Sequence, residues 1–465
     1  MKKIFSILLI NLFFLININT TYSQSLKYFT LKEAQEFALE NNYDIKNAYT
    51  DIQIANKRVK ESVSIGFPQI NGSLSNSNYL NIATTLLPDF ITPVIYQVNE
   101  NDFGLEPEVP LGEPKFFPAQ FGTKYNLTAG VTASQLIFSG SYIVGLQAAK
   151  SFLNKSEKQF IKSKIDIKET IAKAYYAVLV TEKNQSILDS TLVDLEKMAY
   201  ETKEIYKIGF VEDTDVDQLD LLVTDMQASI LTAKNQVDIA YSYLKYYMGL
   251  SLIDSIYLTD DLNSLLAEIN QTALMSTVFD YTQNIDYIIL KNQKNLSHLL
   301  LKLEKSSYLP TMSAFFSAQT SAMRNDFNFF DGNKPWYPTT FWGIQLDVPI
   351  FSSGSRNAKV HQKKLELNKI NEEDKKLKTG LTIQANTLRN EFYNALMVYN
   401  NKQKSLEIAK KIYKKTEIKY LEGISSSMDL LQAHNQFLTA ESDYINSIFN
   451  LLETKLTLEK LLTKN

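Results

Sequence analysis

Ile137-Phe138-Ser139-Gly140-Ser141 returns 213 residues later, with one added serine, as Ile350-Phe351-Ser352-Ser353-Gly354-Ser355. Each copy joins a segment of alternating apolar and polar residues to a long segment without proline. Tyr206-x-x-Gly209 likewise returns as Tyr420-x-x-Gly423, at an offset of 214. Solenoid repeats recur every 20–50 residues or so, a much shorter period. The sequence therefore predicts a duplicated domain that folds as one body.

The duplication extends toward the N-terminus at a larger offset. Asn42-Tyr43-Asp44-Ile45 matches Asn284-Ile285-Asp286-Tyr287, and Pro68 matches Pro310, both at 242. Because the offset falls from 242 at Pro68 to 213 at Phe138, the first copy contains an insertion between these two residues. We expect a first structural repeat over residues 24–270 and a second over 271–465.

Residues 1–23 have the pattern of a secretory signal peptide. Met1-Lys2-Lys3 is basic, Ile4–Ile18 is mainly apolar, and small residues follow. A transmembrane helix, the alternative, would need about 20 apolar residues without interruptions such as Asn11 and Asn17. The chain contains no cysteine, which excludes disulfides, thiolate metal sites and a lipid-modified N-terminal cysteine. We expect an exported protein.

Proline positions predict where the long helices lie. Residues 119–309 and 350–465 contain none of the eleven prolines. Apolar residues between Leu367 and Tyr420 recur in steps of three and four, as in coiled coils. We expect long helix pairs over 141–248 and 355–462, with the turns at the two Tyr-x-x-Gly motifs, where glycine permits a left-handed cap.

Two pairs of strands are predicted between the helices. The segments 125–137 and 342–350 alternate apolar and polar residues with period two, and weaker partners begin at Pro68 and Pro310. We expect β-hairpins over 68–137 and 310–350, the first with a long extracellular loop over 81–121. One apolar face and one polar face are typical of strands in an outer membrane. A soluble β-hairpin domain is the alternative.

Four strands cannot close a barrel, because the smallest barrels have about eight. An open edge in lipid leaves backbone groups unpaired, at a cost of several kcal/mol for each group. If these strands span a membrane, the chain must oligomerise, and three chains would supply twelve strands.

The ordered motifs resemble the TolC-type outer-membrane efflux proteins. The resemblance covers essentially the whole mature chain and rests on Leu31-x-x-Ala34, Ala38-Leu39-x-x-Asn42, Pro68, Leu136-Ile137-Phe138-Ser139-Gly140 and Tyr206-x-x-Gly209, with the later motifs repeated. It implies an α plus transmembrane β fold, in which a homotrimer joins a 12-stranded β-barrel in outer-membrane lipid to a periplasmic α-helical barrel. It also implies a channel of an efflux or type I secretion system, working with a periplasmic adaptor (membrane fusion) protein and an inner-membrane pump.

The same resemblance assigns roles to the helix turns. It places Tyr206, Gly209, Tyr420 and Gly423 at the periplasmic tip. It assigns the aperture and its selectivity to Asp215 and Asp429, and Gln432 stands where the family has a second carboxylate.

Closure of the aperture is expected to differ from some relatives, because Ser425 replaces a basic residue there. A weaker hydrogen-bonded closure by Thr214, Asp215 and Tyr420 is one possibility. In the alternative reading, Asp215 and Asp429 only stabilise the start of a helix, by about 0.3–1 kcal/mol. The strand–helix junctions are expected at Pro68, Pro310, Phe138 and Phe351.

No motif in the sequence indicates catalysis or the binding of a metal or cofactor. The three histidines, His298, His361 and His434, are far apart in sequence, and no phosphate-binding or nucleophile motif is present. We therefore expect no enzyme activity, no metal and no cofactor. The net charge of −3, without a basic stripe, makes nucleic acid an unlikely partner. An exported coiled-coil structural or adhesive surface protein is the main alternative function, and a periplasmic adaptor is another.

Overall fold

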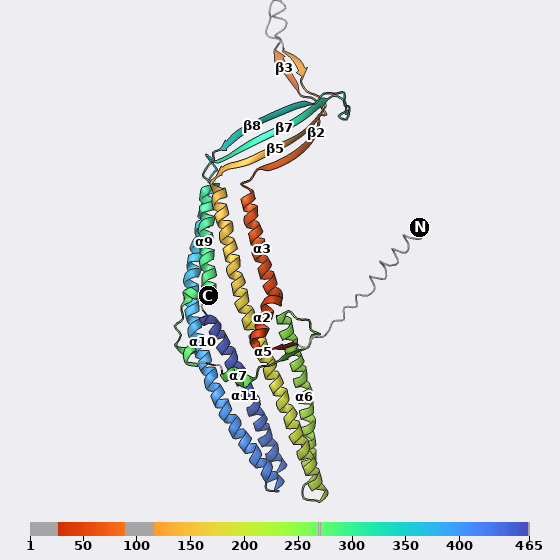
Figure 1. The fold of residues 1–465 in the computed structure, drawn as a ribbon, viewed down its shortest axis with the longest axis vertical. Helices are drawn as coiled ribbons and strands as arrows, with labels where there is room; N and C mark the ends of the chain where they lie inside the picture. The colour runs from red at the N-terminus through yellow and green to blue at the C-terminus, as the bar shows by residue number, and fades with distance from the viewer. Residues whose placement is uncertain (1–26, 89–115, 268, 270, 464–465) are drawn as a thin grey trace, which may run out of the picture. The chain divides into compact units, whose positions relative to one another are not determined.

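The computed structural model describes residues 27–463 except 89–115, 268 and 270 (Figure 1). The predicted signal peptide and most of the predicted 81–121 loop lie outside these residues. The chain divides into a helical unit, formed by segments up to residue 56, 151–296 and from 367 onward, and a strand unit, formed by 57–150 and 297–366. The proposed boundary between the two repeats, at residues 270 and 271, remains a prediction.

The strand unit contains one antiparallel sheet of four strands. They are β2 (Gln69–Asn78), β5 (Tyr125–Ser139), β7 (Thr311–Arg324) and β8 (Tyr337–Asp347), in the order β2-β5-β7-β8. Each predicted hairpin pairs its own two strands, and β5 and β7 join the hairpins. Pro68 and Pro310 directly precede β2 and β7, where a missing N–H interrupts no strand pairing.

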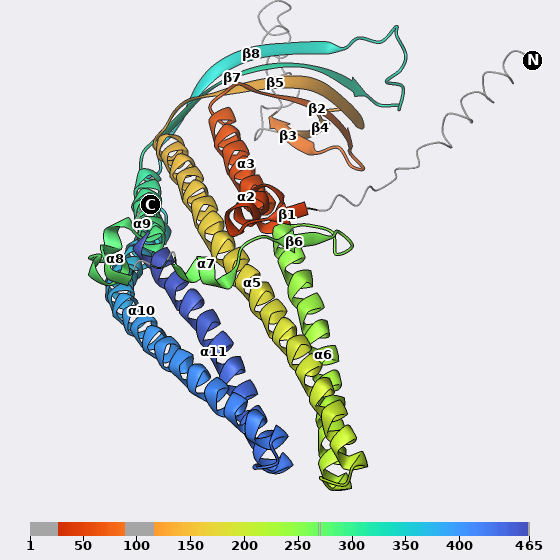
Figure 2. The same cartoon turned by 60° about the horizontal axis from the view of Figure 1, so that its bottom comes forward.

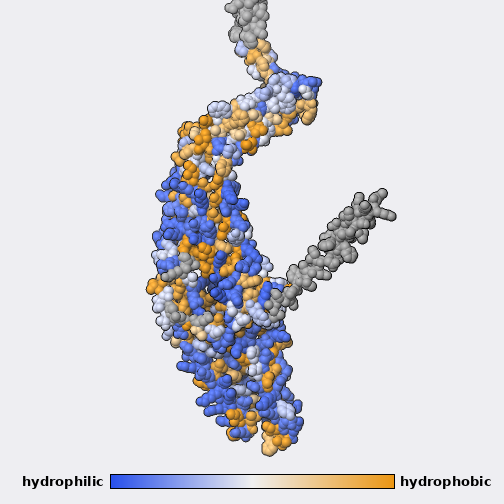
Figure 3. All heavy atoms as spheres, viewed as in Figure 1, coloured by the Kyte–Doolittle hydropathy of each residue, from blue (hydrophilic) through white to orange (hydrophobic). Residues whose placement is uncertain are grey.

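Strand register gives the sheet two chemically different faces. Val131 lies opposite Gly72 and Ala318, and Phe316 lies opposite Trp342. This apolar face is uncovered in the chain, since Trp342 is 74% exposed. On the other face hydroxyl groups pair across strands, and Figure 3 shows both kinds of side chain along the sheet. Because successive side chains point to opposite faces, this strand pairing places the apolar residues on one face of the sheet and the polar residues on the other.

Part of the predicted 81–121 loop is a second, short ribbon. β3 (Thr84–Pro88) pairs with β4 (Phe116–Gln120) in antiparallel register. These strands were not predicted, because each has five residues and includes a proline. A two-stranded ribbon has two outer edges, and a proline, which lacks an N–H, can face such an edge without interrupting the pairing.

Four long helices form two antiparallel hairpins, each drawn as adjacent coils in Figures 1 and 2. The first hairpin is α5 (Gly140–Lys207) and α6 (Asp213–Met248), and the second is α10 (Ser355–Leu421) and α11 (Ser427–Leu462). With 68 and 67 residues, α5 and α10 are the longest helices. A rise of 1.5 Å per residue makes each about 100 Å long. The four long helices therefore lie within the two long proline-free segments, as predicted.

Shorter helices and one small parallel strand pair complete the structure. α2 (Leu31–Asn41), α3 (Tyr43–Ser64) and α9 (Ile285–Ser306) precede the sheet hairpins. α7 (Leu262–Ala267), α8 (Gln271–Ser276) and a 3-10 turn lie on either side of the predicted repeat boundary. β1 (Lys27–Phe29) pairs with β6 (Ile256–Leu258). These three-residue strands are too short for a period-two pattern to predict. No helix in the described part of the chain is both long and apolar enough to cross a membrane.

A buried tyrosine fixes the small strand pair to α5. The Tyr175 hydroxyl lies 3.0 Å from the Phe29 carbonyl oxygen and 3.0 Å from Asp260 Oδ2, which also accepts a hydrogen bond from the Leu31 N–H. Burial raises the pKa of Tyr175 well above its usual value, so the hydroxyl keeps its proton. A buried hydroxyl with partners stabilises the packing, whereas an unpartnered one would cost about 1–3 kcal/mol.

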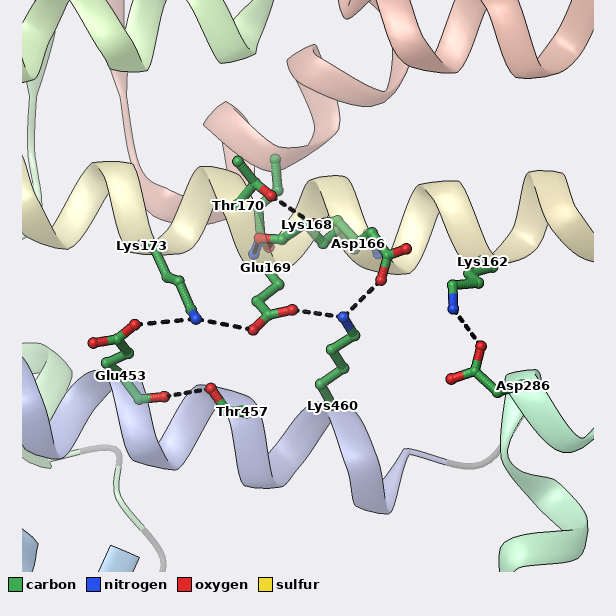
Figure 4. A network of polar contacts seen from close by, with 11 residues as sticks. Lys162, Asp166, Lys168, Glu169, Thr170, Lys173, Asp286, Glu453, Thr457 and Lys460 are labelled. Carbon is green, nitrogen blue, oxygen red and sulfur yellow. Dashed lines mark hydrogen bonds and ion pairs between the residues drawn. The ribbon is translucent and has the colours of Figure 1, made fainter. Parts of the chain in front are cut away.

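Ion pairs connect α11 to α5 (Figure 4). Lys460 Nζ lies 2.6 Å from both Asp166 and Glu169, and Lys173 bridges Glu169 and Glu453 at 3.1 and 3.0 Å. Burial alone would raise the pKa of Glu169, but hydrogen bonds from Lys460 and Lys173 outweigh it and lower that pKa. The network therefore holds the C-terminal part of α11 through charges that persist at neutral pH.

Candidate functional site

The turn of each helical hairpin is closed by a glycine in the left-handed region. Gly209 has φ 80° and Gly423 has φ 73°. The Gly423 N–H donates to the Tyr420 carbonyl at 2.9 Å, and the Ile424 N–H donates to the Lys419 carbonyl at 2.8 Å. These bonds satisfy carbonyl groups that the end of α10 would otherwise leave open. A Cβ on Gly423 would meet nothing within 4 Å, so the backbone angle, not space, requires glycine.

Asp429 forms a capping box with Ser426 at the start of α11. Its Oδ2 accepts from the Ser426 hydroxyl at 2.8 Å and the Ser426 N–H at 3.1 Å, while Ser426 Oγ accepts from the Asp429 N–H at 3.1 Å. Ser425 Oγ adds a third donor at 3.2 Å. These hydrogen bonds, those of Ser426 first, lower the pKa of Asp429. The carboxylate thus combines an exposed negative charge with a helix-start role.

Asp215 occupies the same position in the first hairpin but differs in exposure. Its Oδ2 accepts from the Glu212 N–H at 3.2 Å, and its side chain is half-buried. Gln432 is exposed and lines a groove of about 610 Å³ along α11, together with Met428 and Asn435. The fold therefore brings Asp429 and Gln432 onto the first two turns of one helix. The geometry within one chain agrees with the helix-start reading, and aperture roles remain predictions.

Thr214, Asp215 and Tyr420, the residues of the expected closure, make no hydrogen bond to one another within the described chain, and closure in an assembly remains a prediction. Tyr420 is buried, and its hydroxyl lies 3.0 Å from Thr202 Oγ1 on α5. Thr214 is exposed in the first turn of α6 and donates instead to Glu212, at 3.4 Å. Burial raises the pKa of Tyr420, the hydrogen bond with Thr202 partly opposes this, and the Asp215 charge adds a smaller increase. Thr202 is the better partner because its hydroxyl is fully buried beside Tyr420.

The two Tyr-x-x-Gly motifs are consequently not equivalent. Tyr420 is 7% exposed, whereas Tyr206 is 45% exposed. A second cross-hairpin bond joins Ser427 Oγ to Gln218 Oε1 at 2.9 Å. Thr202, Gln218 and Ser427 were not predicted as site residues. Gln218 could have been found, because it matches Gln432 in the repeat, but nothing in the local sequence marks Thr202.

Apolar side chains are exposed around both turns. Phe210 is 80% exposed and Ile424 is 71% exposed, and Ile208 and Met428 accompany them. Figure 3 shows orange side chains at the ends of both hairpins. Exposed apolar groups beside polar ones are typical of interaction surfaces. This exposed apolar surface was not predicted, because the residues beside each Tyr-x-x-Gly motif were interpreted only as parts of a turn.

Close backbone packing marks the predicted strand–helix junctions. Phe138 follows a register shift in β5, and a Cβ on Gly140 would lie 2.5 Å from Leu309 Cδ1. Phe351 is exposed in the second copy, where the added serine, Ser353, has φ 50°. The added residue therefore gives the second junction a different turn from the first.

Metal-ligating residues do not converge in the described chain. No group of three histidine, aspartate or glutamate side chains is placed to hold a metal ion there. His298 and His361 are exposed, and His434 is buried in α11.

Comparison with known proteins places the chain in one family. The family model described as outer membrane efflux protein matches residues 36–250 and 300–464. Outer membrane protein TolC of Vibrio cholerae is 18% identical over 344 residues, which cover 72% of this chain and 76% of TolC. The probable efflux pump outer membrane protein TtgC of Pseudomonas putida is 21% identical over 412 residues, covering 84% of this chain and 81% of TtgC.

Solved structures have the same fold. The CmeC outer membrane channel of Campylobacter jejuni matches with a TM-score of 0.68 at 18% identity, covering 93% of this chain and 85% of CmeC. The open state of the MtrE outer membrane channel of Neisseria gonorrhoeae also gives 0.68, at 15% identity, covering 93% and 88%. The resemblance to TolC-type proteins and the predicted combination of long helices with strands are confirmed. The homotrimer and its closed 12-stranded barrel remain predictions.

Proposed function

The chain belongs to the outer membrane efflux protein family, and we propose that three copies assemble into one tunnel across the outer membrane. The observation that carries this proposal is the sheet, with one apolar face, one hydroxyl-rich face and two open edges. Among the described residues, neither β2 nor β8 has a strand partner on its outer side. In lipid each unpaired backbone group would cost several kcal/mol. Pairing β8 of one copy with β2 of the next removes both edges.

The two faces determine which way the sheet curves around the passage. Trp342 and Phe316 belong on the lipid side because their rings are exposed and no described segment covers them. Thr128 and Ser321, whose hydroxyls lie 3.1 Å apart, belong on the water side. Twelve strands from three copies exceed the eight or so that a small barrel needs.

The helix turns supply the aperture and the docking surface in this proposal. Asp429, Gln432 and Asp215 of three copies would line the narrow end, where a ring of carboxylates favours cations. The exposed Phe210 and Ile424 give the hairpin ends an apolar surface that a helical partner can cover. We propose a periplasmic adaptor as that partner and an inner-membrane pump as the source of energy.

Electron microscopy of the detergent-purified protein, followed by bilayer recording, tests the assembly. Threefold end views and discrete conductance steps support the tunnel. Monomers, or stalks without a lumen, contradict it and favour the exported surface-protein alternative. Crosslinking from Phe210→Cys and Ile424→Cys, introduced into a chain without cysteine, tests the docking surface separately. Capture of an adaptor is expected from these positions and not from a cysteine in place of exposed His361.

A further inference from the structure

His434 is a buried histidine without a hydrogen-bond partner. Its side chain is 1% exposed, and neither Nδ1 nor Nε2 has a partner among the described residues. It lies on α11, five residues beyond Asp429, with its ring 5.4 Å from that of Tyr413 at 60°. Buried polar groups nearly always have partners, so an orphaned imidazole requires an explanation.

The surroundings of His434 form the contact between the two helical hairpins. Tyr413 belongs to a buried cluster with Met198 of α5, Leu219 of α6 and Leu430 of α11. Ala433, the neighbour of His434, is part of the same cluster. The imidazole therefore sits beside the apolar packing that holds α10 and α11 against α5 and α6, close to their turns.

Charged groups near the ring come from two of the three neighbouring helices. The charge of Asp194 on α5 acts on His434. Helix α10 contributes the uncharged Tyr413, whose ring contacts that of His434, and Glu417, whose charge acts on Tyr413. Burial, then Asp194, raises the pKa of Glu417, whereas Lys197 and Lys414 oppose this. Helix α6 contributes apolar side chains to the cluster, and the nearest carboxylate on α11 itself, in sequence, is that of Asp429.

Protonation of His434 is unfavourable in this arrangement. Burial lowers its pKa to about 4, and the Asp194 charge only partly opposes that change. The ring is therefore neutral at neutral pH, when apolar packing can accommodate it. A charged imidazolium without an acceptor is costly to bury, so it must reach water or Asp194 by leaving its present position.

We propose that His434 is an acid-responsive switch of the hairpin contact: when its ring takes up a proton, α10 and α11 separate from α5 and α6 near their turns. The separation itself is a property of one chain. Only its consequence, a wider aperture, rests on the proposed tunnel. A histidine suits this role because it is the side chain whose charge changes most readily between neutral and acidic conditions.

Spin labels at the two turns measure the separation directly. The full chain, free of native cysteine, receives Phe210→Cys and Ile424→Cys, both exposed positions. Coexpression with an excess of unlabelled chain leaves most assemblies with one labelled copy. Distance distributions are recorded from neutral pH down to a pH of about 4. We expect a longer component to appear on acidification, and to be absent in His434→Leu.

Matched variants separate the switch from other acid effects. His361→Leu removes an exposed histidine and should respond as the parent does. Asp194→Asn should move the transition to lower pH, because it removes the charge that favours protonation. An acid response that persists in His434→Leu, or a parent chain that shows none, overturns the proposal.

A second measurement remains decisive if His434→Leu fails to fold. The chain has three histidines, so His298→Gln with His361→Gln leaves His434 as the only one. Nitrogen-15 NMR of this protein reports the protonation of that ring. Titration well below the ordinary histidine pKa supports the proposal, and titration near the ordinary value overturns it.

Discussion

Thr202 and Tyr420 are 218 residues apart in the sequence, yet their hydroxyl oxygens lie 3.0 Å apart in the interior of the structure. Thr202 is on α5 and Tyr420 is on α10, so this hydrogen bond joins the two helical hairpins one turn before Gly423. Both groups are buried, which removes water as a competing partner. Whatever opens the hairpin ends must break this contact.

Tyr420→Phe should loosen the hairpin ends, because it leaves the buried Thr202 hydroxyl without a partner. The expected loss is about 1–3 kcal/mol of unfolding free energy. Bilayer recording should show more frequent opening at neutral pH. Tyr206→Phe is the control from the other repeat, since Tyr206 is exposed and its hydroxyl makes no comparable bond among the described residues. Equal behaviour of the two variants would contradict a closing role for Tyr420.

The helix-start role of Asp429 and its proposed aperture role can be separated by mutation. Asp429→Asn removes the negative charge and should shift the reversal potential toward lower cation selectivity. Asp429→Glu keeps the charge and should keep the selectivity. Ser426→Ala removes the cap but leaves the charge, so it should cost about 1 kcal/mol of stability with selectivity largely retained. If Asp429→Asn leaves the reversal potential unchanged, Asp429 is only a helix-start residue.

The Asp429 carboxylate should keep its negative charge to a lower pH than an ordinary aspartate does. Hydrogen bonds from Ser426 and Ser425 lower the pKa of Asp429, so the carboxylate stays charged below the ordinary aspartate value. Its contribution to selectivity and to the cap is present above the unfolded pKa and is lost only as pH falls through the lower folded pKa. In Ser426→Ala this loss should move to higher pH, which recordings across an acid titration would detect.

Two glycines in the same backbone region should respond differently to alanine. Gly423→Ala places a Cβ in open space at φ 73°, so only conformational strain of about 1–2 kcal/mol is expected. Gly249→Ala adds a Cβ 2.5 Å from the Asn41 carbonyl oxygen at φ 75°. The thermal unfolding temperature should therefore fall further for Gly249→Ala than for Gly423→Ala, because the backbone of α2 must move as well. Similar losses would mean that this backbone contact relaxes freely.

The ion-pair network at the end of α11 should stabilise the chain, and its contribution should depend on pH. Lys460→Gln removes the shared partner of Asp166 and Glu169, and about 1–2 kcal/mol should be lost because the network is only partly buried. Lys207→Gln, which breaks an exposed pair with Glu204, should cost less because solvent screens that pair.

The pH dependence of this difference follows from Glu169, whose pKa is lowered in the folded chain. Stability from its pairs is present above the unfolded pKa and is lost as pH falls through the folded pKa. The gap in unfolding free energy between the parent and Lys460→Gln should therefore shrink in acid. A gap independent of pH would assign the effect to packing of the lysine stem.

The long elements were predictable because their signals are long. Proline-free segments of more than a hundred residues predict α5 and α10, and period-two alternation predicts β5 and β8. The β1–β6 pair could not be predicted, since three residues carry no periodic signal and its partners are brought together by Tyr175. The helical hairpins turn at Gly209 and Gly423, the glycines of the two repeated motifs. The contact of Tyr420 with Thr202 could not be predicted, because it depends on helix packing between segments far apart in the chain.

The two faces of the sheet provide the most direct test of membrane insertion. Val131 and Thr132 are neighbours on β5, and side-chain alternation places them on opposite faces, Val131 opposite Ala318 and Thr132 opposite Ser317. Val131→Lys puts a charge on the apolar face, which near the middle of a bilayer should cost about 2–4 kcal/mol. Thr132→Lys puts the same charge on the hydroxyl-rich face, where water can solvate it. We expect Val131→Lys to reduce assembled protein in the outer membrane, and Thr132→Lys to assemble normally with lower cation conductance. Normal assembly of Val131→Lys would mean that this face does not contact lipid, because water or protein would then have to solvate the new charge.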